Sequence, residues 1–325
     1  MTGFSASVVI PLYNKRAFIR ATLQSALAQS HPATEIIIVD DHSTDGSVAA
    51  IADLIGGTPL GGSVRLIEQA NAGPGPARNR GVAEASGEWV AFLDADDLWQ
   101  PNHLATLAEV AAQYPDAAIV AARHQRVAAT DPLSAPDTSP LAARRIDYFG
   151  EAQAGEILSS TSVAVRRAVL IEAGGFGAFY PGEDFELWTR LALDHVIAVS
   201  ARTTAFYVQQ TGGLMEQHEL GDSGTADLQP VFRTLHRAIH DPRHAGQRQR
   251  LEQYRAFLLR RTVRQAIYRG APREARRAAA ELRAQGGGGG LGWLALLTWL
   301  PAPLLKAGRV ARGGWRGQSS RRATD

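Results

Sequence analysis

The sequence predicts an α/β fold in which a mostly parallel sheet carries helices on both faces. Short, mostly apolar runs alternate with helical segments through the first hundred residues, a spacing typical of strand–helix–strand units. The predicted strands are 7–10, 35–39, 64–67 and 90–93. Because crossovers between parallel strands are right-handed, the carboxyl ends of these strands share one edge of the sheet, where ligands bind in such folds.

Helix signals occupy the segments between these strands. The predicted helices are 19–27, 43–54 and 74–85. Ile19, Leu23 and Leu27 fall at i, i+4 and i+8, which places them on one helical face. The second segment begins with Ser43 and Asp45, residue types that cap helix N-termini.

Three carboxylates end the strand at 90–93, because Asp94, Asp96 and Asp97 follow it within four residues. That much negative charge at the end of a buried strand costs free energy unless a cation or hydrogen-bond donors lie there. Asp94 and Asp96 suit a divalent cation that also bridges the oxygens of a diphosphate. The alternative is that Asp96 or Asp97 caps the helix beginning near Pro101, although a cap needs only one Asp.

Polar side chains also follow the first two strands. Tyr13 could stack on a flat base, or it could be an ordinary half-buried tyrosine. Asp41 could accept a hydrogen bond from the imino N–H of a pyrimidine, and Asp40 could bond its ribose. The alternative for both acids is to cap the segment that follows. All of them lie at the same predicted edge as Asp94, and this convergence indicates a ligand site.

A glycine-rich turn and two arginines belong to the same edge. Residues 71–75 precede a helix, so their backbone N–H groups could face an anion. Arg78 and Arg80 lie on the first turns of that helix. They could neutralise phosphate, or they could pair with the carboxylates.

The composition is that of a globular chain with an uneven charge distribution. Its 325 residues suffice for one large α/β domain plus an appendage, and the absence of cysteine excludes disulfides, thiolate zinc sites and cysteine nucleophiles. Residues 1–247 hold 17 Lys/Arg and 28 Asp/Glu, a net −11, whereas residues 248–325 hold 17 and 4, a net +13. This asymmetry predicts an anionic partner for the tail, either membrane or nucleic acid. The alternative is a solvated Arg-rich helix face, which is favoured for residues 248–285 taken alone. The N-terminus lacks the basic and apolar regions of a signal peptide, so we expect a cytoplasmic location.

Four blocks of the sequence, in order, resemble the motifs of family 2 glycosyltransferases. They are SVVIPLYNK, IIIVDDHSTDGS, NAGPGPARNRGVAEASGEWVAFLDADD and GGFGAFYPGEDFELWTRLA. The resemblance runs from about Ser7 to Tyr207. It implies a GT-A fold, which is Rossmann-like, and an inverting transfer of sugar from a nucleotide-diphosphate donor with Mg²⁺ or Mn²⁺.

The donor nucleotide is expected to contact residues at the strand ends. They are Pro11, Tyr13, Asp40, Asp41, Arg78, Asp94 and Ala95. By resemblance to the family, Pro11, Tyr13 and Asp41 would hold the base and Asp94 would lie near the ribose. Asp96 would bind the metal and the diphosphate.

The second half of the domain is expected to supply the acceptor side and a base. Inverting transfer needs a carboxylate that takes the proton of the acceptor hydroxyl as this attacks the anomeric carbon. Asp184 matches the family's base, and Glu183 would bind acceptor hydroxyls. The alternative for both is the N-terminus of a helix, where the macrodipole favours acids.

One departure from the family follows Tyr207. Many relatives carry an Arg and a His there, and this chain has Val208 and Gln210 instead. A histidine contact to metal or phosphate from this segment is therefore not expected. His218 could substitute, although a single loop histidine is more often only exposed to solvent.

The chain changes character after residue 227. Residues 228–285 form a predicted Arg-rich helical region, and five glycines at 286–290 form a linker. The apolar run at 291–305 spans only about 22 Å as a helix, less than the roughly 30 Å of membrane hydrocarbon. Because Trp, Lys and Arg flank it, we expect residues 291–316 to lie at a membrane interface, on the inner face of the plasma membrane. Docking on the catalytic domain or a homodimer contact is the alternative.

The predicted organisation is therefore a GT-A domain at 1–227, helices at 228–285 and a tail at 286–325. Residues 1–100 would bind the nucleotide, and residues 101–227 would bind the acceptor. We expect transfer from a nucleotide-diphosphate sugar, UDP-linked by preference, to a hydroxyl of a glycan or lipid-linked acceptor, as in the synthesis of a bacterial surface glycan. Alternatives are a nucleotidyltransferase, in which the Glu-Asp block has no role, and an inactive nucleotide-sugar sensor. A nucleic-acid-binding tail is disfavoured, since its arginines mostly lack interleaved aromatic residues.

Overall fold

The protein is described by a computed structural model over residues 3–55, 63–129, 135–153, 157–209, 229–269 and 271–284. These residues divide into two compact units, the first ending at Thr234 and the second beginning at Leu235. The linker at 286–290 and the membrane-interface segment at 291–316 lie outside the described residues and stay predictions.

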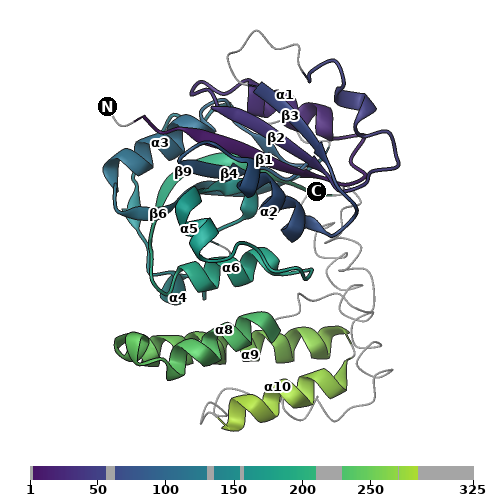
Figure 1. Cartoon of the computed structure of the whole chain (residues 1–325). Coiled ribbons are helices and arrows are strands. Elements are labelled where there is room, and N and C mark those ends of the chain that lie inside the picture. Colours follow the sequence, from purple (N-terminus) through teal and green to yellow (C-terminus); the bar gives the residue numbers. More distant parts are fainter. Residues whose placement is uncertain are drawn as a thin grey trace, which may run out of the picture. The chain divides into compact units, whose positions relative to one another are not determined.

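A single sheet organises the first unit (Figure 1). Nine strands form it in the described part of the chain: β1 (Ala6–Leu12), β2 (Glu35–Asp40), β3 (Ser63–Glu68), β4 (Trp89–Phe92), β5 (Leu98–Trp99), β6 (Ala117–Ala128), β7 (Arg144–Arg145), β8 (Val163–Arg166) and β9 (Val196–Gln209). Their order is β3-β2-β1-β4-β8-β6-β9-β5, with β7 paired to β9. The half of the sheet formed by β1, β2, β3 and β4 is parallel as predicted, because β1 pairs in parallel with β2 and β4, and β2 with β3. The other half is mixed, since β8 runs antiparallel to both β4 and β6.

Helices cover both faces of this sheet. They are α1 (Ile19–Leu27), α2 (Pro74–Glu84), α3 (His103–Gln113), α4 (Tyr148–Glu151), α5 (Arg167–Glu172) and α6 (Glu183–Leu191), with a 3-10 turn η2 (Ser160–Ser162). The even-numbered residues of β1 pack in one apolar cluster with α1 and α3. On the opposite face, α2 approaches β1 so closely that a Cβ at Gly81 would lie 2.3 Å from Val9 Cγ1. A residue without a side chain is therefore required at position 81 for this packing.

The helix predicted over residues 43–54 is wrong. The structure has only a 3-10 turn there, η1 (Ala49–Ile51). Gly46 has φ +87°, which ends any helix begun before it. The predicted cap Asp45 closes a local turn instead, because its Oδ1 accepts a hydrogen bond from the Ser47 N–H at 2.9 Å.

The second unit is helical. Its elements are α8 (Gln229–His240), which begins in the first unit, η3 (Pro242–Gln247), α9 (Arg248–Arg269) and α10 (Pro272–Ala284). Leu251, Tyr254 and Leu258 of α9 recur at helical spacing, and all three are buried. Arg255 of α9 pairs with Glu281 of α10 at 2.6 Å. Among the helices that the structure describes, none is long and apolar enough to cross a membrane.

Candidate active site

The carboxyl ends of β1, β2 and β4 bring the predicted site residues to one edge of the sheet. Leu12 pairs with Asp40, so β1 and β2 end together, whereas β4 ends at Phe92, opposite Val9. Tyr13 follows β1 directly, and Asp94 lies two residues beyond β4. Tyr13 is 38% exposed, so its ring is open to a stacking partner.

Asp41 is buried and holds the glycine-rich turn. Its Oδ1 accepts hydrogen bonds from the Ala72 N–H at 2.9 Å and from Gln69 Nε2 at 2.8 Å, and its Oδ2 accepts one from the Gly73 N–H at 2.8 Å. Two backbone N–H groups of this turn therefore face an anion, which is Asp41 itself. An ionised carboxylate accepts about four hydrogen bonds, and these contacts are three of them. Asp40 accepts from the Ser43 N–H at 3.2 Å, which is the local capping contact.

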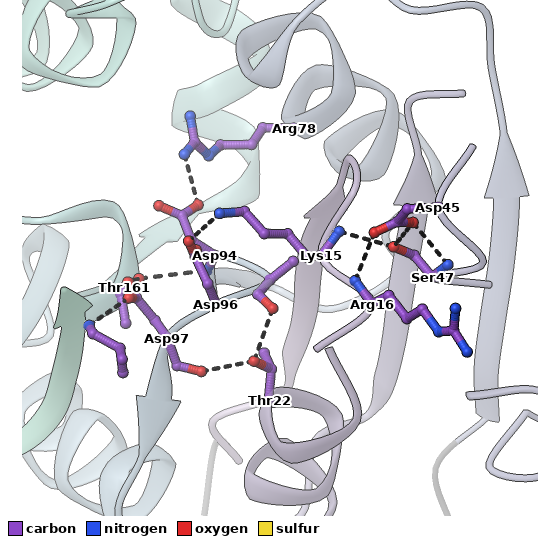
Figure 2. A network of polar contacts seen from close by, with 12 residues as sticks. Lys15, Arg16, Thr22, Asp45, Ser47, Arg78, Asp94, Asp96, Asp97 and Thr161 are labelled. Carbon is purple, nitrogen blue, oxygen red and sulfur yellow. Dashed lines mark hydrogen bonds and ion pairs between the residues drawn. The ribbon is translucent and has the colours of Figure 1, made fainter. Parts of the chain in front are cut away.

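Each acid after β4 contacts a different partner (Figure 2). Asp94 Oδ1 accepts from Arg78 Nη2 at 2.7 Å, and Asp96 Oδ2 accepts from Lys15 Nζ at 2.5 Å. None of these acids caps α3, because the N-cap residue is Asn102 and no side chain caps that helix. The capping alternative for Asp96 and Asp97 is therefore wrong. Ala95 is buried, and its carbonyl accepts from Thr22 Oγ1 at 3.0 Å.

Asp97 connects the acidic loop, residues 94–97 after β4, to two other segments. It accepts a hydrogen bond from Thr161 Oγ1 of η2, and its Oδ1 accepts another from the Val208 N–H of β9 at 3.0 Å. Burial raises the pKa of Asp97 well above its usual value, and the nearby charges of Asp96 and Asp94 raise it further. Val208 is one of the two positions at which the sequence departs from the family that it resembles. Its contact with Asp97 is made by the backbone N–H and so does not depend on the side chain. Gln210 and His218 lie outside the described residues.

Arg78 bridges the loop after β4 and the start of α6. Its side chain is 5% exposed, and it donates to Asp94 Oδ1 and to Glu183 Oε1, each at 2.7 Å. Burial lowers the pKa of Arg78, but the carboxylates of Asp94 and Glu183 outweigh it and keep the guanidinium charged. Of the two predicted roles, the structure shows the pairing with carboxylates. Arg80, whose side chain is 53% exposed, instead pairs with Glu84 at 3.0 Å.

The two acids of the Glu-Asp block begin α6. Gly182 precedes them with φ +106°, a left-handed conformation that favours glycine. Glu183 is buried, whereas Asp184 is half-buried, with Oδ2 3.3 Å from the donating Ser160 Oγ and Oδ1 2.7 Å from the Phe185 N–H. Burial raises the pKa of Asp184 to about 7, with a further increase from Glu183 and an opposing effect of Arg78. A carboxylate with this pKa is suited to accept a proton near neutral pH.

Several residues of this site were not predicted from the sequence. They are Lys15, Thr22, Ser160, Thr161, Tyr180 and Tyr207. The contacts of Asp97 with Thr161 and Val208 were not predicted either. Burial raises the pKa of Tyr180 and of Tyr207, and in each case neighbouring acids of the site add to it. The two tyrosines therefore lie at the site as neutral groups. Their only signal in the sequence is position, since Tyr180 lies within the fourth block and Tyr207 ends the region of resemblance.

The carboxylate oxygens at this edge are suitable ligands for a divalent cation. No group of three or more His, Asp or Glu among the described residues is arranged to hold one, however. Asp94 and Asp96 supply hard carboxylate oxygens, the ligand type that Mg²⁺ and Mn²⁺ prefer. Their side chains are 28% and 18% exposed and so reach solvent. The remaining ligands would be diphosphate oxygens and water, as is usual for Mg²⁺ at phosphates.

Comparisons with known proteins agree with this arrangement. The family model "Glycosyl transferase family 2" matches residues 7–174. The chain is similar to the uncharacterized glycosyltransferase alr2836 of Nostoc sp., with 47% identity over 104 residues, 32% of this chain and 32% of that protein. The match thus spans about a third of the length of that relative.

Solved structures share the fold over almost the whole chain. The crystal structure of S. aureus TarS 1–349 in complex with UDP-GlcNAc matches with a TM-score of 0.69 and 19% identity, covering 97% of this chain and 92% of that one. The mannosyltransferase PcManGT of Pyrobaculum calidifontis, in complex with GDP-Man and Mn²⁺, matches with a TM-score of 0.58 and 22% identity, covering 97% and 83%. These matches confirm the predicted GT-A fold. Because the family model also covers more than half of the sequence, the chain belongs to glycosyl transferase family 2.

Proposed function

We propose that this chain is an inverting glycosyltransferase that moves a sugar from a nucleotide-diphosphate donor to a hydroxyl, with Asp184 as the general base. One observation carries the proposal: Arg78 binds Asp94 of the donor edge and Glu183, the neighbour of Asp184, at 2.7 Å each. It therefore holds a candidate base beside the residues that follow β1, β2 and β4. The donors bound to TarS and PcManGT are nucleotide sugars, which supports this substrate class.

On the donor side, the protein would bind the nucleotide with residues already fixed in place. Tyr13 would stack on the base, and Asp41 would accept its N–H through the remaining acceptor position. Asp94 would bond the ribose. A divalent cation held by Asp96 would neutralise the charge that develops on the leaving diphosphate.

On the acceptor side, Asp184 would take the proton. The acceptor oxygen forms a bond to the anomeric carbon, the bond from that carbon to the diphosphate breaks with its electron pair leaving on the diphosphate, and the hydroxyl proton passes to Asp184 Oδ2. Ser160 Oγ, 3.3 Å from that oxygen, orients the carboxylate. Glu183 is buried and bound by Arg78, whereas Asp184 is half-buried and accepts a hydrogen bond from Ser160, which makes Asp184 the acid of this pair that is proposed as the base.

The Asp184→Asn variant tests this assignment. It should bind donor nearly as the wild type does and lose transfer by about 10² or more, the usual contribution of a general base. Asp194→Asn provides the control, since Asp194 is an exposed acid just beyond the same helix. If Asp184→Asn weakened donor binding while turnover stayed the same, Asp184 would be a helix cap and the proposal would be wrong.

The acceptor is proposed to be a hydroxyl of a glycan or of a lipid-linked precursor. A nucleotidyltransferase, the rival of similar fold, gives Asp184 and Ser160 no role. Product analysis separates the two, because glycosyl transfer releases a nucleoside diphosphate whereas nucleotidyl transfer releases pyrophosphate. Screening nucleotide sugars with Mn²⁺ by thermal shift would name the donor, since a bound ligand stabilises the folded state.

A further inference from the structure

Lys15 lies just beyond β1, and its side chain reaches across to the acidic loop after β4 (Figure 2). Its Nζ is 2.5 Å from Asp96 Oδ2, and the two side chains are 13% and 18% exposed. Lysines at a protein surface normally keep the ammonium in water. A lysine enclosed to this degree against one carboxylate therefore makes a specific contact.

The backbone on which Lys15 stands is held in place. Asn14 has φ +49°, the left-handed conformation that Asn tolerates better than most residues, and its Oδ1 accepts from the Thr44 N–H at 2.8 Å. The Lys15 N–H donates to Ser47 Oγ at 2.8 Å. The turn after β1 is thus bound to the loop after β2, and only the side chain of Lys15 is left to change direction.

Lys15 and a metal ion would compete for Asp96. Metal–oxygen distances of about 2.1 Å, added to the 2.5 Å from Nζ to Oδ2, would put the two cations within about 5 Å of each other. Like charges at that separation repel. This repulsion favours departure of the ammonium from Asp96 when a divalent cation binds there.

We propose that Lys15 exchanges partners: it holds Asp96 in the metal-free protein and binds the donor's diphosphate once a divalent cation has taken Asp96. This inference rests on the metal-binding role proposed for Asp96. An ammonium with three N–H donors on a flexible four-carbon stem suits phosphate oxygens. Lys15 is then a donor-binding residue whose pairing keeps the acidic loop in order between turnovers.

The exchange predicts two shifts of opposite sign in Lys15→Met. Without nucleotide, Mn²⁺ should bind about tenfold more tightly, as measured by electron paramagnetic resonance of the free ion, which corresponds to about 1.4 kcal/mol. At saturating Mn²⁺, UDP or GDP, whichever binds the wild type, should bind about tenfold more weakly in calorimetry. General damage to the site would weaken both affinities. Lys15→Gln gives the same test should Lys15→Met fold poorly.

Arg16→Met is the matched control. It removes the same charge from the next residue, whose side chain points away from Asp96 (Figure 2) and whose N–H donates to Asp45 at 2.9 Å. Neither affinity should change in this variant. An unchanged or weaker Mn²⁺ affinity in Lys15→Met, or an unchanged nucleotide affinity, would overturn the exchange while leaving the glycosyltransferase proposal intact. A wild type that binds nucleotide but no Mn²⁺ would instead refute the metal role of Asp96, and the exchange with it.

Discussion

Replacing Arg78 with Met should destabilise the first unit by about 3–5 kcal/mol, the cost of removing one partner from a buried ion pair. The Arg78 and Glu183 side chains are 5% and 3% exposed and 2.7 Å apart, so the substitution leaves a carboxylate buried without its cation. Asp94, 28% exposed, loses the same partner but can be solvated in its place. The cost therefore comes mainly from Glu183.

Arg80→Met is the matched control for this effect. Arg80 lies on the same helix, 53% exposed, and pairs with Glu84 at 3.0 Å at i,i+4. Such exposed pairs stabilise by about 0.3–0.5 kcal/mol. Both variants make the same change of residue in α2, so helix propensity cancels in the comparison.

The assay is urea unfolding of the two variants and the wild type at pH 8. The difference between the variants should be about 3 kcal/mol or more. Arg78 also lowers the pKa of Asp184, so its loss should move the acid limb of kcat/KM to higher pH. If Arg78→Met were within about 1 kcal/mol of Arg80→Met, the buried bridge would not hold the site together, and the reasoning would be refuted.

Four further predictions remain, the first three from the structure and the last from the sequence of the tail. Asp96→Asn should abolish Mn²⁺-dependent binding of the nucleoside diphosphate in calorimetry without unfolding the protein, and an unchanged Mn²⁺ dependence would contradict the metal role. Since the pKa of Asp184 is about 7 and the base must be ionised, kcat/KM should rise about tenfold per pH unit below pH 7 and level above it, and a flat profile would contradict the base role. The same group should make the free energy of unfolding fall as pH rises from about 4 to about 7, because its folded pKa exceeds the ordinary 3.8 and the folded state holds the extra proton in that window. Deleting residues 286–325 should release the protein from anionic liposomes and spare donor hydrolysis; retention on liposomes would contradict a membrane role for the tail.

The strand ends could be predicted from the sequence because burial dictates them. Continuous apolar runs locate β1, β2 and β4, and the rule for parallel crossovers then brings Tyr13, Asp41 and Asp94 to one edge. The register of the three strands agrees with that expectation. Recognition of the Glu-Asp block added Asp184, which no periodicity indicates.

The partners of these residues could not be predicted in the same way. Lys15 and Asp96 are 81 positions apart, and Asp97 and Val208 are 111 apart, so their contacts depend on the whole fold and on side-chain direction. The wrong helix at 43–54 has a related cause. Asp45 can cap a helix or close a local turn, and contacts from the loop after β1, such as the Arg16 N–H at 2.9 Å, favour the turn.

The acids of the site fall into two groups according to their hydrogen-bond partners. One group is bound to backbone N–H groups, and the other is bound to side chains. Asp41 is 3% exposed and Asp97 is 1% exposed, and both accept backbone N–H groups, which cannot move without the chain. Asp94 and Asp96 are 28% and 18% exposed and are paired with the side chains of Arg78 and Lys15. On the proposed function, a donor would therefore engage the second pair of acids without disturbing the first. Of these two, Asp96 would exchange partners more readily, because the Arg78 that binds Asp94 is also bound to the buried Glu183.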